Sequence, residues 1–554
     1  MVFDICPRVK QYTERAGMFA CKKLKVFSLG DSRLFFSTMR ILMPQLTVEQ
    51  ASYSEANLRI SVTEDYSSKR EYCSFRIRED RIEVHCRDAA GTRNAAAILA
   101  QIFRNDEGGY ILPCGDLQDW PDAQYRAFMV ESSGRVWMPM DRILGYVKEM
   151  ALCRMNVLQF HFMEDPGCTV PLESVPGFHG GPGGEKFTRQ EVDGLIAYAA
   201  DLGIRVVPFI EVLSHAADFA LAEGLVCPGD DLENLYDVCL GQEKTYTAIE
   251  KVIREVAKIF PDEVIHIGAD EYDMSRVTPK TAYWDKCPHC RTLMEKMGYT
   301  TLRELFLYGI RRINEIVNSC GKVMMMWNAD LYPGHLPEEL DRNILIHYYR
   351  YCSDLGREDI FNLHINGYAD EGFSVINSYY PQTYMDLPEY MSAEKLNSWT
   401  YLNDPLAKAS NRPRIPGGCL CAWEDFDHYR RTIPAAIALF ADRLWNAKGD
   451  PAPYDDAYGV AMTRLIFGGK LPEGMNVFAC VGNVLPPLKD DAPAHLRMVF
   501  TPIETLEKTR DALAKLETDP VAKAYLDAVN WVIEEKKKLP SYAGPQKKRI
   551  AFQG

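Results

Sequence analysis

From residue 126 onward, the chain alternates between short apolar runs and longer amphipathic stretches. The apolar runs have the length of strands, and in the stretches between them apolar residues recur at helical spacing. Eight such runs begin at Arg126, Asn156, Ile204, Glu263, Lys322, Ile344, Ser374 and Gly417. Repeated strand and helix units of this kind are typical of a parallel sheet covered by helices. Eight units predict a closed (β/α)8 TIM barrel.

The chain on either side of these units has a different pattern. Residues 58–62 and 82–86 alternate apolar and polar positions, which is typical of strands with one buried face, and TRNAAAILAQIFR, from Thr92, predicts a helix. After Trp445 the chain becomes rich in Pro and Gly, and two helical patterns run from Thr501 to Lys538. We therefore expect a small α/β domain at 1–118, the catalytic barrel at 119–450 and a helical C-terminal region at 451–554.

Composition and charge narrow the classes of partner. The chain has 554 residues, 47% of them hydrophobic, and a net charge of -14 at pH 7. An acidic protein repels polyanions on average, so we expect neither nucleic acid nor a membrane as partner. No apolar stretch reaches the length of about 18 residues that a bilayer requires, and the first twenty residues lack the apolar core of a secretion signal. The sixteen scattered Cys favour reduced thiols, so we expect a cytoplasmic protein.

The ends of the predicted barrel strands carry the residues that could do chemistry, because reactive groups of such barrels lie there. Residues 264–271 read VIHIGADE, an apolar strand followed by two small residues and the adjacent carboxyls of Asp270 and Glu271. Small residues let a ligand approach the backbone, and two neighbouring carboxyls move their pKa values apart, so that one can hold a proton near neutral pH. This pattern favours acid/base catalysis. The alternative is that the two acids begin the next helix.

The segment HIGADE resembles the His-x-Gly-Gly-Asp-Glu motif of glycoside hydrolase family 20, the β-N-acetylhexosaminidases. Other segments resemble family motifs in the same order: Asp119-Trp120-Pro121 with Tyr125-Arg126, NVLQFHFMEDPG at 156–167, PFIEVLSHA at 208–216, and the strand ends at Trp327, Tyr384 and Trp423. The resemblance extends from about residue 90 to residue 446, and the small N-terminal unit also resembles the α/β domain that commonly precedes this barrel.

The resemblance implies an exo-acting enzyme that hydrolyses terminal non-reducing GlcNAc or GalNAc with retention. The 2-acetamido oxygen of the substrate would be the nucleophile and would form an oxazolinium intermediate, an exception to the scheme with two catalytic carboxylates. Glu271 would be the general acid/base, and Asp270 would orient the acetamido group. The residues expected to bind the sugar are Arg126, Trp327, Tyr384, Asp386, Trp423, Asp425 and Glu424. Supporting roles are expected for Asp165, His215 and His266.

The expected partner is a small oligosaccharide or glycoconjugate with a terminal N-acetylhexosamine, and we expect no cofactor and no metal; a homodimer stays open. The chain departs from the family pattern at Phe209, Glu211 and Ser214, where the family has Glu, Asp and Gly. Strand eight reads Trp423-Glu424-Asp425 where the family has Trp-x-Glu, which puts Asp425 in register and makes Glu424 its rival.

Several alternatives remain at the level of the sequence. Trp327 could belong to the barrel core, and His215 could be a buried structural histidine. The chain could be a barrel metallohydrolase, such as an amidase or deacetylase, with His161, His215, His266 and the acids as ligands, or a carbohydrate-binding protein without turnover. Cys287-Pro-His-Cys290 offers too few ligands for a metal or redox site by itself, so we interpret these residues as ordinary loop thiols.

Overall fold

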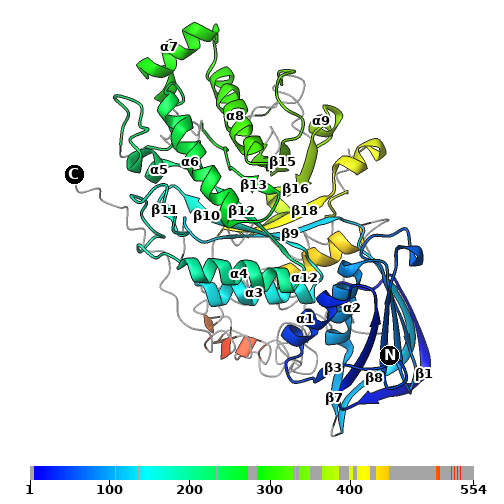
Figure 1. The fold of residues 1–554 in the computed structure, drawn as a ribbon. Coiled ribbons are helices and arrows are strands. Elements are labelled where there is room, and N and C mark those ends of the chain that lie inside the picture. Colours follow the sequence, from blue (N-terminus) through cyan, green and yellow to red (C-terminus); the bar gives the residue numbers. More distant parts are fainter. Residues whose placement is uncertain are drawn as a thin grey trace.

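A computed structural model of the chain describes residues 5–106, 108–134, 137–232, 235–272, 283–328, 331, 336–349, 365–385, 399–402, 408–423 and 432–447, together with single residues between 507 and 537 (Figure 1). Three residues expected at the sugar, Asp386, Glu424 and Asp425, lie outside this set. Nearly all of the predicted C-terminal region also lies outside it, and the single residues described there are helical. No described helix is both long enough and apolar enough to span a bilayer.

Eight parallel strands form a closed barrel, because the first of them, β9, pairs with both β10 and β18. The strands are β9 (Tyr125–Glu131), β10 (Val157–Glu164), β12 (Arg205–Ile210), β13 (Val264–His266), β14 (Val323–Trp327), β15 (Leu345–Tyr348), β16 (Ser374–Asn377) and β18 (Gly417–Ala422). Two short strands extend the sheet, β11 (Gly167–Cys168) and β17 (Tyr384–Met385). Each barrel strand begins within one residue of a predicted run, so the predicted barrel is confirmed.

Helices follow the strands and cover the outside of the barrel (Figure 1). Those described are α3 (Met140–Leu152), α4 (Arg189–Asp201), α5 (Ala217–Ala222), α6 (Glu243–Ile259), α7 (Pro288–Met297), α8 (Leu302–Ser319), α9 (Ile365–Asp370), α10 (Tyr380–Thr383) and α12 (Thr432–Trp445). Two of them begin with capping boxes, in which Thr188 pairs with Glu191 and Thr301 pairs with Glu304. The chain leaves α8 through Gly321, whose φ of +71° suits a residue without a side chain.

The N-terminal part is a separate α/β sheet structure. Its strands run in the order β1-β8-β5-β6-β4-β2-β3, with β7 beside β8. Their bounds are β1 (Gln11–Cys21), β2 (Leu24–Leu29), β3 (Val48–Gln50), β4 (Leu58–Val62), β5 (Cys73–Ile77), β6 (Ile82–Cys86), β7 (Arg104–Asp106) and β8 (Gly109–Asp119). Helices α1 (Arg33–Leu42) and α2 (Ala89–Ile102) lie between this sheet and the barrel helices α3 and α4 (Figure 1). Helix α2 begins before Thr92 because the Asp88 side chain caps it.

Buried charges join the two sheet structures at the N-terminal end of the barrel strands. The Glu71 carboxylate accepts hydrogen bonds from Arg126 on β9, at 3.0 and 2.6 Å, and from Arg93 on α2 at 3.2 Å. Arg154 donates to Asp119, the last residue of β8, at 2.6 Å. The side chain of Arg126 is 0% exposed, so its guanidinium is held at the opposite end of the barrel from the strand ends that carry the acids. This placement contradicts the expectation that Arg126 binds the sugar.

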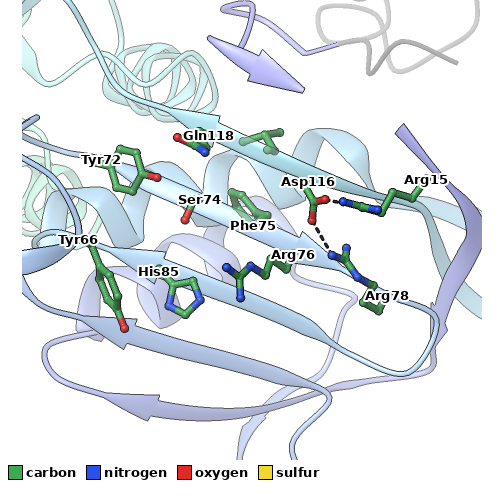
Figure 2. A pocket seen from close by; sticks show the side chains of 11 residues that line it. Arg15, Tyr66, Tyr72, Ser74, Phe75, Arg76, Arg78, His85, Asp116 and Gln118 are labelled. Carbon is green, nitrogen blue, oxygen red and sulfur yellow. Dashed lines mark hydrogen bonds and ion pairs between the residues drawn. The ribbon is translucent and has the colours of Figure 1, made fainter. Parts of the chain in front are cut away.

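The other face of the N-terminal sheet carries a hollow of about 590 Å³ (Figure 2). Arg76, Tyr66, Tyr72 and His85 are among the residues that line it. Figure 2 shows Asp116 between two further arginines, Arg15 and Arg78. The Asp116 carboxylate accepts a hydrogen bond from Arg78 at 2.8 Å. The hollow contains none of the predicted site residues.

Candidate active site

A cavity of about 120 Å³ lies at the C-terminal ends of the barrel strands. The residues that line it are Glu131, Gly134, Glu164, His215, Asp270, Glu271, Tyr349, Tyr384 and Trp423. They come from the last residues of six different barrel strands or the segments that follow them, and from β17. Five of them, Asp270, Glu271, His215, Tyr384 and Trp423, are among the site residues predicted from the sequence. The fold therefore gathers in one place residues that are up to 292 positions apart in the chain, from Glu131 to Trp423.

A strained turn presents the two adjacent carboxyls. After β13 ends at His266, the backbone is left-handed at Gly268 (φ +64°), Ala269 (φ +66°) and Glu271 (φ +58°). Left-handed backbone is costly for residues with a Cβ, and such strain is characteristic of functional sites. The turn places the carboxyls of Asp270 and Glu271 on the cavity, with side chains 13% and 23% exposed.

The turn rests on the buried carboxyl of Glu211. Its Oε2 accepts a hydrogen bond from the Ala269 backbone N–H at 3.1 Å. A Cβ at Gly268 would lie 1.7 Å from the same oxygen, so only glycine fits there. Burial raises the pKa of Glu211 well above its usual range, and the neighbouring charge of Asp270 raises it further. Both effects favour the neutral form of the Glu211 carboxyl beneath the turn.

His215 lies between the acids, also with a left-handed backbone (φ +50°). Its Nδ1 is 2.9 Å from Glu164 Oε1, and its Nε2 is 3.6 Å from Glu271 Oε2 and 3.9 Å from Asp270 Oδ1. Burial alone would lower the pKa of His215, but Asp270 and Glu164 outweigh burial and hold this pKa well above its usual value. His215 is therefore an imidazolium that offsets the negative charge of the acids around it.

Sequence reasoning missed Tyr236, whose hydroxyl is hydrogen-bonded to Nε2 of His215. Burial, reinforced by the charges of Glu271 and Asp165, raises the pKa of Tyr236 well above its usual value, so the phenol stays neutral. Tyr236 lies in the connection between α5 and α6, away from every predicted strand end. Neither periodicity nor a motif marks it, so nothing in this single sequence could have identified it.

Three aromatic rings form a wall of the cavity. The rings of Tyr349 and Tyr384 are nearly parallel, at 9° and 6.3 Å between centroids, and Trp423 lies 5.6 Å from Tyr384. Burial raises the pKa of Tyr384 well above its usual value, so its hydroxyl remains a hydrogen-bond donor. Tyr349, which follows β15, was visible in the sequence as a strand-end residue, but no motif assigned it a role.

Trp327 lies beneath this wall and does not line the cavity. It is fully buried and stacks on His347 at 3.9 Å between ring centroids, with Trp423 5.9 Å away on the cavity side. The alternative in which Trp327 belongs to the barrel core therefore describes its position better than direct contact with the sugar. Its packing supports the ring of Trp423 from below.

His266 and Asp165 occupy positions that stabilise other parts of the site. Nδ1 of His266 accepts a hydrogen bond from the Gly268 N–H at 3.0 Å, and Nε2 is paired with His347 at 3.0 Å. Burial lowers the pKa of His266 well below its usual value, so the ring is neutral. Asp165 Oδ1 accepts from the Ala217 N–H at 3.2 Å at the start of α5. Of Asp165 and the residue before it, Glu164, it is Glu164 that pairs with Nδ1 of His215.

The metallohydrolase alternative uses three histidines and the acids as ligands, and the fold separates the histidines. The ring of Phe209 lies between His161 and His266, stacked on them at 3.9 and 3.8 Å. His215, Asp270 and Glu271 do lie within 4.8 Å of one another and could hold a cation. Of the three histidines, only His215 belongs to this group.

The comparison with known families decides the classification. Residues 124–434 match the model of the glycosyl hydrolase family 20 catalytic domain. The chain belongs to glycoside hydrolase family 20. A β-hexosaminidase from Vibrio furnissii is 27% identical over 337 residues, covering 55% of this chain and 51% of that enzyme. The β-hexosaminidase subunit A1 of Dictyostelium discoideum is 25% identical over 411 residues, 71% of each chain.

Solved structures of this glycoside hydrolase family share the fold. The crystal structure of β-N-acetylhexosaminidase from Bacteroides fragilis has a TM-score of 0.71 at 24% identity and covers 84% of this chain and 95% of that one. An exo β-N-acetylglucosaminidase from Vibrio harveyi, solved in complex with N-acetylglucosamine, has a TM-score of 0.69 at 20% identity, covering 81% and 75%. The match spans about half the length of the Vibrio furnissii enzyme, so the substrate of this glycoside hydrolase has to be argued from its own site.

Proposed function

We propose that the chain is an exo-acting β-N-acetylhexosaminidase that removes terminal non-reducing GlcNAc or GalNAc by a substrate-assisted, retaining mechanism. The observation that carries the proposal is the pair of adjacent carboxyls, Asp270 and Glu271, on a cavity walled by Tyr384 and Trp423. Both acids leave one turn, so they approach a bound sugar from neighbouring positions. An internal nucleophile fits this arrangement, since it needs no carboxylate on the far side of the ring.

The other two acids on the cavity already have partners. Glu131 Oε1 accepts hydrogen bonds from the backbone N–H groups of Ser133, at 2.9 Å, and Gly134. Glu164 pairs with the imidazolium of His215 at 2.9 Å. Because these partners hold both carboxylates, neither Glu131 nor Glu164 is placed as a nucleophile for the sugar. This supports the acetamido oxygen of the substrate as the nucleophile.

In the proposed first step, Glu271 donates its proton to the glycosidic oxygen while the acetamido carbonyl oxygen attacks C1. The bond between C1 and the glycosidic oxygen breaks, the alcohol leaves and the sugar becomes an oxazolinium ion. Asp270 accepts a hydrogen bond from the acetamido N–H and offsets the developing positive charge. Tyr384 donates a hydrogen bond to the acetamido oxygen and keeps it in line with C1. In the second step, water gives a proton to Glu271 and attacks C1, which restores the acetamido group and the configuration.

General principles give the size of each contribution. A positioned general acid accelerates such a reaction by roughly a hundred- to ten-thousand-fold. Holding the nucleophile in line adds several kcal/mol, on the order of what other oriented intramolecular reactions gain. The reacting sugar carries no charge. This agrees with a cavity in which the imidazolium of His215 already offsets negative charge of the carboxylates.

The test is hydrolysis of p-nitrophenyl β-GlcNAc and β-GalNAc by the wild type, Glu271→Gln and Asp270→Ala. A matched control is Glu263→Gln, at the opposite end of the same strand, where the side chain is 72% exposed. We expect turnover in the wild type and the control, loss of at least a hundredfold in both site variants, and inhibition of the wild type by N-acetylglucosamine-thiazoline. If both variants kept the turnover of the wild type, the proposed roles of Asp270 and Glu271 would be wrong. If the wild type hydrolysed neither glycoside, the proposed substrate would be wrong.

A further inference from the structure

Four cysteines from two distant segments lie close together. Cys227 and Cys239 lie in the connection between α5 and α6, whereas Cys287 directly precedes α7 and Cys290 lies in its first turn. All four are buried. The Sγ of Cys239 is 3.6 Å from that of Cys287 and 3.7 Å from that of Cys290, and the Cys227 and Cys290 Sγ atoms are 4.0 Å apart. Ligand atoms of all four lie within 4.8 Å of one another.

These distances are those of a tetrahedral thiolate site. Zinc binds sulfur at about 2.3 Å, which places the sulfurs of a tetrahedral site about 3.8 Å apart. A disulfide would bring two sulfurs to about 2.05 Å. The three Sγ distances given above bracket the tetrahedral value, and the four cysteines are free thiols. The cluster therefore has the number and the spacing of ligands that a structural zinc ion takes.

The surroundings of the cluster suit a ligating sulfur. The Gln242 side chain and the Gly241 backbone N–H are hydrogen-bonded to the Cys239 sulfur. Backbone and side-chain N–H groups that donate to a ligating sulfur are a common feature of metal sites, since they orient the ligand and stabilise its charge. A bound divalent cation would deprotonate the thiols that ligate it.

The backbone approaches closely where the two segments meet. A Cβ at Gly241 would lie 2.3 Å from the carbonyl carbon of His289 and 2.4 Å from the backbone N of Cys290, so only glycine allows this contact. Next to it, Trp284 Nε1 donates to the Val238 carbonyl at 2.9 Å. The sequence offered only the Cys-x-x-Cys pair of α7, and the fold supplies the other two ligands from 48 to 63 residues away.

We propose that Cys227, Cys239, Cys287 and Cys290 bind one structural zinc ion. Four protein ligands leave no open position for a substrate or water, so the ion has no part in the chemistry of hydrolysis. Its role is to clamp the segment that carries Tyr236 onto the segment that follows the catalytic pair. Tyr236 lies between Cys227 and Cys239, and its hydroxyl contacts His215.

The clamp also reaches the other side of the catalytic turn. Tyr272, the residue after Glu271, stacks on Trp284 at 5.2 Å between ring centroids and on Phe306 at 4.8 Å. Trp284 lies three residues before Cys287 and bonds to Val238, one residue before Cys239. The zinc ion would therefore fix Tyr236 and the end of the catalytic turn in one rigid unit.

The test measures metal in the intact chain, expressed with zinc in the medium and purified without chelators. Mass spectrometry of the metal content should give about one zinc per chain in the wild type. Cys227→Ser and Cys290→Ser should each lose most of it, whereas Cys320→Ser should keep it, because that partly buried thiol at the end of α8 lies outside the cluster. Glu271→Gln should also keep it, which separates this proposal from the proposed function.

A second measurement does not depend on the folding of any variant. Replacement of the metal by cobalt in the wild type should give the intense thiolate-to-cobalt charge-transfer band and the visible bands of a tetrahedral site. The proposal would be overturned by wild-type chain that carries no zinc and whose four thiols react with a thiol reagent in the folded state. A disulfide between any two of the four, found by mass spectrometry of peptides, would overturn it as well.

Discussion

Addition of one methyl group at Gly268 should disrupt the turn that presents the catalytic pair. The Cβ of an alanine there would lie 1.7 Å from Glu211 Oε2 and 1.9 Å from its Cδ. Glu211 is buried, and its Oε2 holds the Ala269 N–H, so the carboxyl has little room to move away without losing that hydrogen bond. The variant must therefore displace either Glu211 or the turn itself.

The expected size follows from two costs. Left-handed backbone with a Cβ costs about 1–2 kcal/mol, and φ at Gly268 is +64°. A buried polar group that loses its partner costs about 1–3 kcal/mol more. Gly268→Ala should thus lower the free energy of unfolding by about 2–5 kcal/mol. Displacement of the acids by about 1 Å should lower kcat/KM by roughly a hundredfold.

Urea unfolding and p-nitrophenyl glycoside kinetics would measure both effects. The matched control is Ala269→Gly, because relief of the left-handed strain at Ala269 is offset by the greater freedom of glycine in the unfolded chain. This control should stay within about 1 kcal/mol of the wild type. In a Glu211→Ala background, Gly268→Ala should cost clearly less, since the clashing carboxyl is gone. Equal stability and activity of Gly268→Ala and the wild type would refute the reasoning.

Three further predictions concern groups around the site. Tyr236→Phe removes the hydroxyl bonded to His215, so kcat should fall about tenfold or more, in keeping with the strength of hydrogen bonds to charged groups, while thermal unfolding changes little; unchanged kinetics would contradict this. Glu164→Gln should lower the pKa of His215, because a neighbouring negative charge is lost. A His215 pKa that is higher in the folded chain than in the unfolded chain, where it is about 6.5, stabilises the fold. This stabilisation is complete at pH values below about 6.5 and is lost as the pH rises through the pKa of the folded chain. Urea unfolding should therefore show a larger loss of stability in the variant at about pH 6 than at alkaline pH. Glu71→Ala leaves Arg126 buried without its partner and should cost about 3–5 kcal/mol of stability, with KM unchanged; a higher KM at unchanged stability would show that Arg126 does reach the sugar.

The barrel was predictable because of a simple physical pattern. Strands buried on both faces read as continuous apolar runs, and all eight runs became strands within one residue of where they began. The start of α2 was harder, since it depends on the single capping side chain of Asp88. The acid pair and Trp423 were visible because they follow runs closely, whereas Tyr384, which α10 separates from β16, was found through its resemblance to a family motif.

What the sequence could not show depends on residues brought together from far apart. The direction of the Arg126 side chain is set by its parity on β9 and by Glu71, which lies 55 positions earlier. Arg126 begins the first predicted run, so the run already places it at the N-terminal end of its strand, and the expectation that it binds the sugar came only from the resemblance to the family motif. Likewise, Cys287 and Cys290 looked like a pair of loop thiols because their two partners lie in another connection.

The buried charges between the two sheets determine whether the barrel can exist without the N-terminal sheet. Both buried guanidiniums at the base of the barrel, Arg126 and Arg154, are neutralised by carboxylates that the barrel strands do not supply: Glu71 precedes β5, and Asp119 ends β8. A barrel severed from the N-terminal sheet would lose both counterions and the surface that buries the two guanidiniums. We therefore expect the catalytic unit to depend on the N-terminal sheet for its stability, and an exchange of that sheet to require either the same two carboxylates or changes at both arginines.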